Sequence, residues 1–344
     1  MKNETWLAPA YYKDFCCKVE KCRHTCCSNW LIPVSKQEYY KLITIECSED
    51  LSRRIQNTFV VPETVSDSCY RFISFNWLGN CPLNNEGFCR LHREKGEECL
   101  PEVCRLYPRS LKQINDVKIA SCSSSCERVV EMLRENNALN IGEIKLSEEP
   151  KLFYQIDEED IRKMMVFDDL LKKDDEALAD KIASICTIIN REEFEKDYSA
   201  DEDPLNEAIR LLSRFSSSNQ ILDEIVEQID KRYKGEDNLF DSDRRSFEKN
   251  YPDWMDFFER VINNSMIYEC FPFVDKRADQ TRVYKGLCAT YGLLRLVCIA
   301  NTAEEASEEK LVDAVSALFH LIDHTPFYYN ISCIIDNTAI LLKL

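Results

Sequence analysis

The chain has 344 residues and a formal net charge of −17, with 44% hydrophobic and 31% charged residues. This composition allows a buried core and excludes a disordered or collagen-like chain. Seven glycines leave little room for the Gly-rich loops of nucleotide-binding folds, and neither GxGxxG nor GxxxxGKS/T occurs.

Cysteines and charges are unevenly distributed along the chain. Thirteen of the 18 cysteines lie at or before Cys126, and residues 1–130 are nearly neutral, with 18 basic and 16 acidic side chains. Residues 131–344 have 26 basic and 45 acidic side chains. We therefore predict a Cys-rich module over residues 1–130 and an acidic helical domain over 131–344. The acidic excess disfavours nucleic acid and suits a Lys-rich protein partner, although a solvated acidic face is the simpler interpretation.

The N-terminal part is expected to consist of short, irregular elements, because proline and glycine turn signals are frequent there. A helix is predicted over residues 35–45, where Ser35 and Glu38 have the capping-box spacing. A second helix is predicted over residues 122–137. The sequence shows no alternating strand series, so at most a short hairpin is expected in the Cys-rich part.

The C-terminal part is predicted to be helical. Residues 147–204 contain 19 Asp and Glu against 8 Lys and Arg, yet apolar residues recur at helical spacing between Ile161 and Leu171. Residues 198–204 are the best linker candidate. Apolar stripes predict further helices over 205–212, 221–229, 254–262, 281–300 and 307–323. The expected fold class is mainly α, with an irregular Cys-rich N-terminal module packed on a helical C-terminal part.

The sequence indicates a cytoplasmic protein that does not enter a membrane. The N-terminus does not resemble a secretory signal, and the longest apolar patch, near residues 293–300, is interrupted by Arg295. Because cytosolic thiols stay reduced, the cysteines are expected to bind a metal rather than form disulfides. A secreted disulfide scaffold that has lost its signal is the alternative.

The N-terminal cysteines form three groups with close spacing. Soft thiolates that converge from such groups bind zinc tetrahedrally or hold an iron–sulfur cluster. We therefore predict a metal or cluster site in this part and expect the five later cysteines to pack as small apolar groups. The three groups are Cys16, Cys17, Cys22, Cys26 and Cys27; Cys81, Cys89, Cys99 and Cys104; Cys122 and Cys126.

Other candidate residues give weaker signals. His24 and His92 lie among the cysteines and could be ligands, but ordinary polar loop positions explain them equally simply. His320 and His324 share a helix face, although no HExxH motif supports a metal site there. The Cys-x3-Cys-x2-Cys loop of radical S-adenosylmethionine chemistry is not matched, because Asn29 stands where the third cysteine would be.

The cysteine motifs resemble those of a known family. The segments Phe15–Trp30, Cys81-Pro82-Leu83, Glu86-Gly87-Phe88-Cys89 and Leu100–Arg109 resemble the opening of the flagellin lysine-N-methylase family (FliB-like). Ser125-Cys126-Glu127 is similar to the third Cys motif of that family. The resemblance is specific over residues 9–130 and looser around 263–272 and near 324. Smaller zinc- or iron-chelating Cys-rich domains share part of the pattern.

This resemblance implies methyl transfer from S-adenosylmethionine to lysine ε-amines of flagellin or a similar Lys-rich protein. It also implies an iron–sulfur cluster, with [4Fe–4S] favoured and zinc as the alternative. A non-catalytic zinc- or iron-binding protein is the alternative function. Eight ligands exceed the four that one centre needs, so we expect two centres or some packing residues. No S-adenosylmethionine pocket or catalytic base is identified. The cysteines that match the family are Cys17, Cys22, Cys26, Cys27, Cys81, Cys89, Cys104 and Cys126.

Overall fold

The computed structural model divides the chain into two compact units. The smaller unit comprises Cys16–Pro108, and the larger unit comprises Met1–Phe15 together with Arg109–Leu344. The described residues are 4–24, 26, 32–76, 79–85, 87–135, 138–173, 176–199, 202–215, 219–234, 237–273 and 280–344. Helices predominate, which confirms the predicted mainly α fold class.

The smaller unit is made of short elements around one hydrophobic cluster. It contains a three-stranded sheet of order β2-β4-β3 and a two-stranded β5–β6 hairpin. The predicted first helix is confirmed as α2, where Ser35 and Glu38 form a complete capping box. The elements are η1 (Val19–Lys21), β2 (Pro33–Val34), α2 (Lys36–Ile43), α3 (Glu49–Gln56), β3 (Phe59–Val60), β4 (Arg71–Ile73), β5 (Asn84–Asn85), β6 (Phe88–Cys89), α4 (Arg90–Lys95), η2 (Glu97–Cys99) and α5 (Glu102–Leu106).

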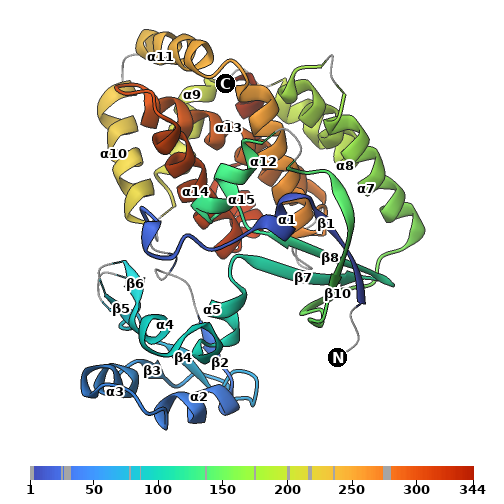
Figure 1. The fold of residues 1–344 in the computed structure, drawn as a ribbon. Coiled ribbons are helices and arrows are strands. Elements are labelled where there is room, and N and C mark those ends of the chain that lie inside the picture. The colour runs from blue at the N-terminus through green and yellow to red at the C-terminus, as the bar shows by residue number, and fades with distance from the viewer. Residues whose placement is uncertain are drawn as a thin grey trace. The chain divides into compact units, whose positions relative to one another are not determined.

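The larger unit contains a five-stranded sheet that the sequence analysis did not predict. Its strand order is β10-β7-β8-β1-β9, and β1 lies between a parallel neighbour, β8, and an antiparallel one, β9 (Figure 1). A two-residue turn at Asn115 and Asp116 joins β7 to β8, and Asn115 adopts a positive φ of 50° there. The strands are β1 (Glu4–Pro9), β7 (Arg109–Ile114), β8 (Val117–Cys122), β9 (Ile141–Leu146) and β10 (Leu152–Tyr154).

This sheet explains why the compact units differ from the predicted domains. Strand β1 and residues 109–130 were assigned to the Cys-rich module, with a boundary at residue 130. The ladder pairs Leu7 with Ile119 and Trp6 with Ile144, so both ends of that segment belong to the larger unit. The predicted helix over 122–137 is shorter than expected, because Cys122 ends β8 and α6 begins at Glu127.

Helices form the rest of the larger unit (Figure 1). The helices predicted over 205–212, 221–229, 281–300 and 307–323 are confirmed within a few residues, whereas the one predicted over 254–262 continues to Glu269 and the helix Asp237–Asn250 was not predicted. The linker candidate at 198–204 lies inside this unit. The helices are α1 (Tyr11–Asp14), α6 (Glu127–Leu133), α7 (Glu158–Leu171), α8 (Leu178–Tyr198), α9 (Pro204–Leu212), α10 (Gln220–Tyr233), α11 (Asp237–Asn250), α12 (Trp254–Glu269), α13 (Gln280–Thr302), α14 (Glu308–His324), α15 (Phe327–Ile334) and η3 (Ala339–Lys343).

Helix α13 is the centre of the helical core and contacts α8, α14, α15 and η3. Its segment Thr281–Thr302 is long and apolar enough to cross a membrane, by length and composition alone, and 94% of its most apolar window is buried inside the structure. A helix that is apolar on all sides is expected at such a central position. Two glycines allow neighbours to approach it closely: a Cβ on Gly286 would overlap the ring of Tyr328, and one on Gly292 would lie 2.6 Å from the Cβ of Leu341.

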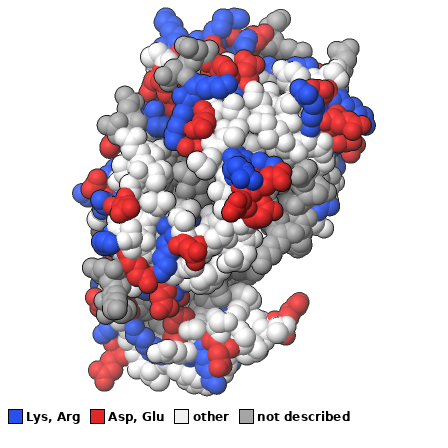
Figure 2. Space-filling view, turned by 90° about the vertical axis from the view of Figure 1, so that its right-hand side faces the viewer, with Lys and Arg blue, Asp and Glu red and all other residues white. Residues whose placement is uncertain are grey.

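Acidic and basic side chains are interspersed on the face of the molecule shown in Figure 2. Many of these charges are paired along helices, as in Lys163 with Glu159 and Lys231 with Glu227. The excess negative charge of residues 131–344 is therefore partly offset locally by neighbouring cations.

Candidate functional site

Three of the predicted cysteine ligands border the hydrophobic cluster of the smaller unit. Cys81 is part of that cluster, and Cys89 and Cys104 pack against it. Local turns hold these cysteines: the N–H of Asn84 donates to the carbonyl of Cys81 at 2.9 Å, and Cys89 directly precedes helix α4. Cys99 and Cys47 pack against the same cluster. Cys99 is not among the eight cysteines that match the family, but it packs against the same cluster as three of them.

The earlier cysteines lie on the segment around η1. Cys17 and Cys26 are exposed, Cys22 is half-buried, and Cys27 lies outside the described residues. The N–H of Val19 points at the Sγ of Cys17, 3.4 Å away. Val19 has a positive φ of 56°, an unfavourable conformation for a β-branched residue. Backbone strain of this kind clusters at ligand-binding sites, which fits a role for the Cys17–Cys22 loop.

The eighth predicted ligand, Cys126, belongs to the larger unit and directly precedes α6. All 17 described cysteines are free thiols. Among the later cysteines, Cys186 and Cys288 are buried with their sulfurs 3.6 Å apart, as expected for packing residues. Cys270 and Cys298 are also buried, whereas Cys333 is exposed, so the predicted packing role is wrong for Cys333.

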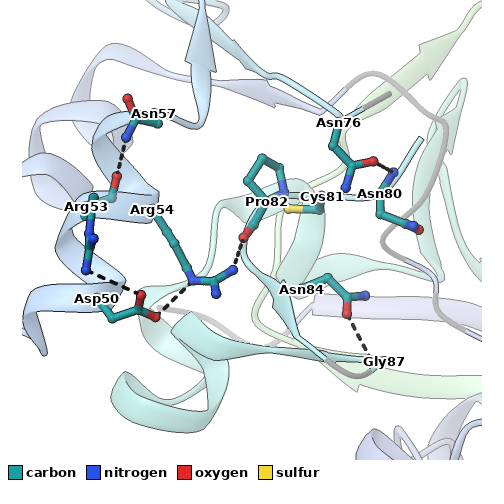
Figure 3. A pocket seen from close by; sticks show the side chains of 10 residues that line it. All are labelled: Asp50, Arg53, Arg54, Asn57, Asn76, Asn80, Cys81, Pro82, Asn84 and Gly87. Carbon is teal, nitrogen blue, oxygen red and sulfur yellow. Dashed lines mark hydrogen bonds and ion pairs between the residues drawn. The ribbon is translucent and has the colours of Figure 1, made fainter. Parts of the chain in front are cut away.

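The smaller unit also contains a polar pocket of about 700 Å³ beside Cys81 (Figure 3). Arg54 is held at its wall, since its Nε donates to Asp50 Oδ2 at 3.0 Å and its Nη1 donates to the carbonyl of Pro82 at 3.2 Å. The pocket thus places guanidinium and amide groups next to one predicted ligand. Its lining consists of Asp50, Arg53, Arg54, Asn57, Asn76, Asn80, Cys81, Pro82, Asn84 and Gly87.

A second set of polar side chains lies inside the larger unit, which we call the buried polar cluster. Its members come from β7, from the loop that follows β8, and from the last turns of α12 and α14. Strand β8 packs against α12, which brings these elements together (Figure 1). The members are Lys112, Ser123, Ser125, Tyr268, Glu269, Asp323 and His324.

Hydrogen bonds connect the β8–α6 loop to the end of α14. The hydroxyl of Ser123 donates to Oδ2 of Asp323 and lies 2.5 Å from the hydroxyl of Ser125. The hydroxyl of Ser125 is 3.0 Å from Nε2 of His324. The predicted proximity of the two histidines is confirmed, since the rings of His320 and His324 lie 4.9 Å apart.

The same loop and the end of β8 are also held by hydrogen bonds of Asn264 and Tyr11. The Nδ2 of Asn264 donates to the carbonyl of Cys122 at 3.0 Å and to the hydroxyl of Ser124 at 2.9 Å. The hydroxyl of Tyr11 donates to Oδ1 of Asn264 at 2.7 Å and accepts from the N–H of Cys122 at 2.9 Å. All of these groups are buried, so the loop has little freedom to move.

Burial shifts the acid–base equilibria of the cluster. It raises the pKa of Glu269 to about 7, and the neighbouring Lys112 ammonium limits that rise. It lowers the pKa of Lys112, which the charges of Glu269 and Asp323 oppose. Burial and then the charge of Glu269 raise the pKa of Asp323 well above its usual range. Burial and then His320 lower the pKa of His324 to about 3. Groups perturbed in this way concentrate at functional sites.

Sequence analysis missed Lys112, Tyr268 and Glu269 as candidate residues. Lys112 has little local signal in the sequence, because it is followed by the polar Gln113 between Leu111 and Ile114. A lysine that is 3% exposed on a strand inside the sheet is unusual, but this burial is a property of the fold. The C-terminal position of Glu269 on its helix gave no comparable signal.

Comparison with known families identifies the larger unit. A family model described as the FliB lysine N-methylase C-terminal domain matches residues 117–338. This chain belongs to that family. The match begins at β8 and includes Glu269 and Asp323 of the buried polar cluster. Sequence analysis had expected the resemblance to be most specific over residues 9–130, whereas the family model covers the C-terminal part.

Individual relatives match over part of the chain. The flagellar biosynthetic protein FliU of Salmonella muenchen is 28% identical over 149 residues, which cover 42% of this chain and 86% of that protein. The lysine-N-methylases of Salmonella choleraesuis and Salmonella typhimurium are 28% identical over 147 residues. These matches cover 42% of this chain but 36% of each methylase, about a third of its length. No solved structure matches the chain.

Proposed function

We propose that this protein transfers methyl groups from S-adenosylmethionine to lysine ε-amines of flagellin or another Lys-rich protein. The single observation that supports this most directly is the match of residues 117–338 to the lysine N-methylase family. The names of the relatives, lysine-N-methylase and a flagellar biosynthetic protein, agree with the proposed reaction and substrate. We place the reaction in the cytoplasm, where the free thiols of the smaller unit would persist.

The cysteines of the smaller unit fit the proposed iron–sulfur cluster as a cofactor. Cys81, Cys89 and Cys104 are thiols beside one hydrophobic cluster, a low-dielectric environment in which a thiolate gains from bonding to a metal. With the strained Cys17–Cys22 loop they supply more sulfur donors than one centre needs. When bound, such a cluster supplies an electron-transfer centre or a Lewis-acidic iron.

The larger unit contains acid–base groups suited to the methyl-transfer step itself. S-adenosylmethionine supplies a methyl group on a sulfonium, which a neutral lysine amine attacks, so that S-adenosylhomocysteine and a proton are released. Burial raises the pKa values of Glu269 and Asp323, so these carboxyl groups hold protons at a higher pH than ordinary carboxyl groups and are suited to exchange a proton with a reacting amine. The hydrogen-bonded loop from Ser123 to Ser125 keeps Asp323 in a fixed orientation.

A labelled-methyl assay tests this proposal. The full chain, purified without oxygen, is incubated with methyl-labelled S-adenosylmethionine and flagellin from the same source. We expect label in flagellin and none in flagellin whose lysines have been acetylated beforehand. Absence of label from flagellin and from every other Lys-rich protein, with the metal content intact, contradicts the proposal.

A non-catalytic metal-binding protein is the second candidate. The observation that favours it is the grouping of Cys81, Cys89 and Cys104 in a unit that lies outside the family match. Such a protein would hold zinc or iron but would bind no S-adenosylmethionine, which separates it from the methyltransferase.

A further inference from the structure

The polar pocket of the smaller unit has an excess of positive charge at its wall. One carboxylate, Asp50, contacts three guanidinium groups: Arg54 and Arg90 donate hydrogen bonds to its Oδ2 at 3.0 and 3.1 Å, and Nη2 of Arg53 lies 3.8 Å from its Oδ1. Arg90 has a second carboxylate partner in Glu94, at 2.7 Å. Two carboxylates facing three guanidinium groups leave one positive charge uncompensated.

The two arginines that line the pocket keep donors for another molecule. Nε and Nη1 of Arg54 donate to Asp50 and to the carbonyl of Pro82, whereas its Nη2 has no hydrogen-bond partner among the described residues. These two bonds orient the guanidinium, which Figure 3 shows reaching from its helix toward Pro82. The guanidinium of Arg53 forms no hydrogen bond with any residue that the structure describes.

Two asparagines of the lining use their oxygen atoms inside their own loops. Oδ1 of Asn76 accepts from the N–H of Asn80, and Oδ1 of Asn84 accepts from the N–H of Gly87, each at 3.0 Å. Hydrogen bonds from these two side chains to a ligand therefore come from their Nδ2 ends. Asn57 is the exception, because its Nδ2 donates to a carbonyl of helix α3 at 2.9 Å. The wall thus offers a ligand mainly hydrogen-bond donors.

The size and composition of the pocket indicate a small, polar ligand. Its volume of about 700 Å³ exceeds what a single ion needs and lies in the range of about 300–1,000 Å³ that is typical of small-molecule sites. Among the described lining residues, Cys81 and Pro82 supply the apolar side-chain surface, and none is aromatic. All of the lining belongs to the smaller unit.

We infer that this pocket binds a small polar molecule through a phosphate or carboxylate group. Arg53 and Arg54 donate to the oxygens of that group, because guanidinium groups bind both kinds of oxyanion through charge-assisted hydrogen bonds. Cys81 lines the same pocket, so the bound anion lies beside one of the predicted metal ligands.

The charge of the wall separates this ligand from the reactants of the proposed methyl transfer. A lysine side chain is a cation, and S-adenosylmethionine has a net positive charge, since its ammonium and sulfonium outnumber its carboxylate. Both would be repelled by the uncompensated guanidinium charge. The inference therefore adds a separate ligand and does not depend on the proposed function.

Titration calorimetry of the full chain, purified without oxygen, tests the inference with three probes. Glycerol 3-phosphate represents phosphates, succinate represents carboxylates, and glycerol is the neutral control. We expect saturable binding of at least one anion below about 10 mM and none of glycerol, and the tighter anion identifies the group. Arg53→Gln and Arg54→Gln should each weaken that binding about tenfold.

The matched control is Lys36→Gln, which removes an exposed cation from α2 of the same unit, outside the pocket lining, and should leave the affinity unchanged. Arg53→Gln is the deciding variant, because it breaks no side-chain hydrogen bond to a described residue and should keep the metal content of the wild type. A wild type that binds neither anion overturns the inference. Equal losses in Arg53→Gln and Lys36→Gln also overturn it, because the effect would then be one of overall charge.

Discussion

The Nζ atom of Lys112 lies 4.9 Å from the ring centre of Tyr268 and is almost completely buried. The contact joins the second strand of the sheet, counted from its β10 edge, to the last turn of α12. An aromatic ring compensates only part of the hydration that a buried ammonium loses. The buried charge of Lys112 therefore destabilises the folded protein. Destabilising charges at fixed positions are common at ligand sites.

We predict that Lys112→Met stabilises the protein in the absence of ligands. Methionine keeps the length of the side chain and removes the unpaired ammonium, so the free energy of unfolding should rise by about 1–3 kcal/mol. Chemical denaturation measures the change in the wild type, this variant and the control Lys145→Met, which alters an exposed lysine on β9. A loss of stability in Lys112→Met alone would show that the ammonium already has adequate partners.

We predict that Glu269 makes stability depend on pH. Burial raises its pKa from an ordinary value of 4.5 to about 7, so the folded protein holds this proton more tightly than the unfolded chain. The stabilising contribution is complete below pH 4.5 and is lost as the pH rises through about 7, a change of about 1–3 kcal/mol. Glu269→Gln should therefore gain stability relative to the wild type between pH 5 and pH 8.

Denaturation curves at several pH values measure this difference, with the exposed Glu192→Gln as the control. His324, whose lowered pKa of about 3 removes stability as the pH falls, is present in both proteins and cancels in the comparison. An equal difference between variant and wild type at pH 5 and pH 8 would show that Glu269 has an ordinary pKa.

We predict that Gly286→Ala destabilises the larger unit, although alanine favours helices. A methyl group at this position of α13 would overlap the ring of Tyr328, so either the ring or α15 must move. The expected cost is about 1–3 kcal/mol, which exceeds the gain of about 1 kcal/mol in helix propensity. Gly142→Ala on β9, where a Cβ has no neighbour within 4 Å, is the control for thermal denaturation. Equal melting temperatures for the two variants would be inconsistent with this packing.

We predict that the metal depends on the cysteines of the smaller unit. Anaerobically purified wild type should be brown and contain iron and sulfide, and Cys81→Ala should lose most of both. Cys186→Ala removes a buried thiol of the larger unit and should keep the full content. Metal analysis measures the iron content of each protein, and absorption spectra report the iron–sulfur cluster. A colourless protein that contains zinc would favour the metal-binding alternative. Equal metal content in both variants would show that Cys81 is not a metal ligand.

Local sequence signals predicted the helices of this protein well. The capping box at Ser35 and Glu38 depends on residues three apart, and the apolar stripe of α14 is a property of one segment. The sheet was missed because its pairing is distant: Leu7 lies opposite Ile119, more than a hundred residues away. The Asn115-Asp116 turn was the one local signal for a hairpin in this region.

The candidate site could be predicted only in part, because contacts between residues that are distant in the sequence leave no local signal. Cys81 and Cys89 are close in sequence, so their spacing indicated a shared site. The grouping of Lys112, Glu269 and Asp323 depends on the packing of a strand against two helix ends. No sequence motif indicates such an arrangement, because each of the three residues is by itself an ordinary charged side chain.

The most direct test of the proposed function is peptide mass spectrometry of flagellin after incubation with the iron-loaded protein and S-adenosylmethionine that has a trideuterated methyl group. We predict trideuteromethyl groups on lysine side chains with the wild type, and none when the lysines of flagellin have been acetylated beforehand. A wild type that binds S-adenosylmethionine and retains its iron but places no deuterated methyl group on any lysine would contradict the proposed function.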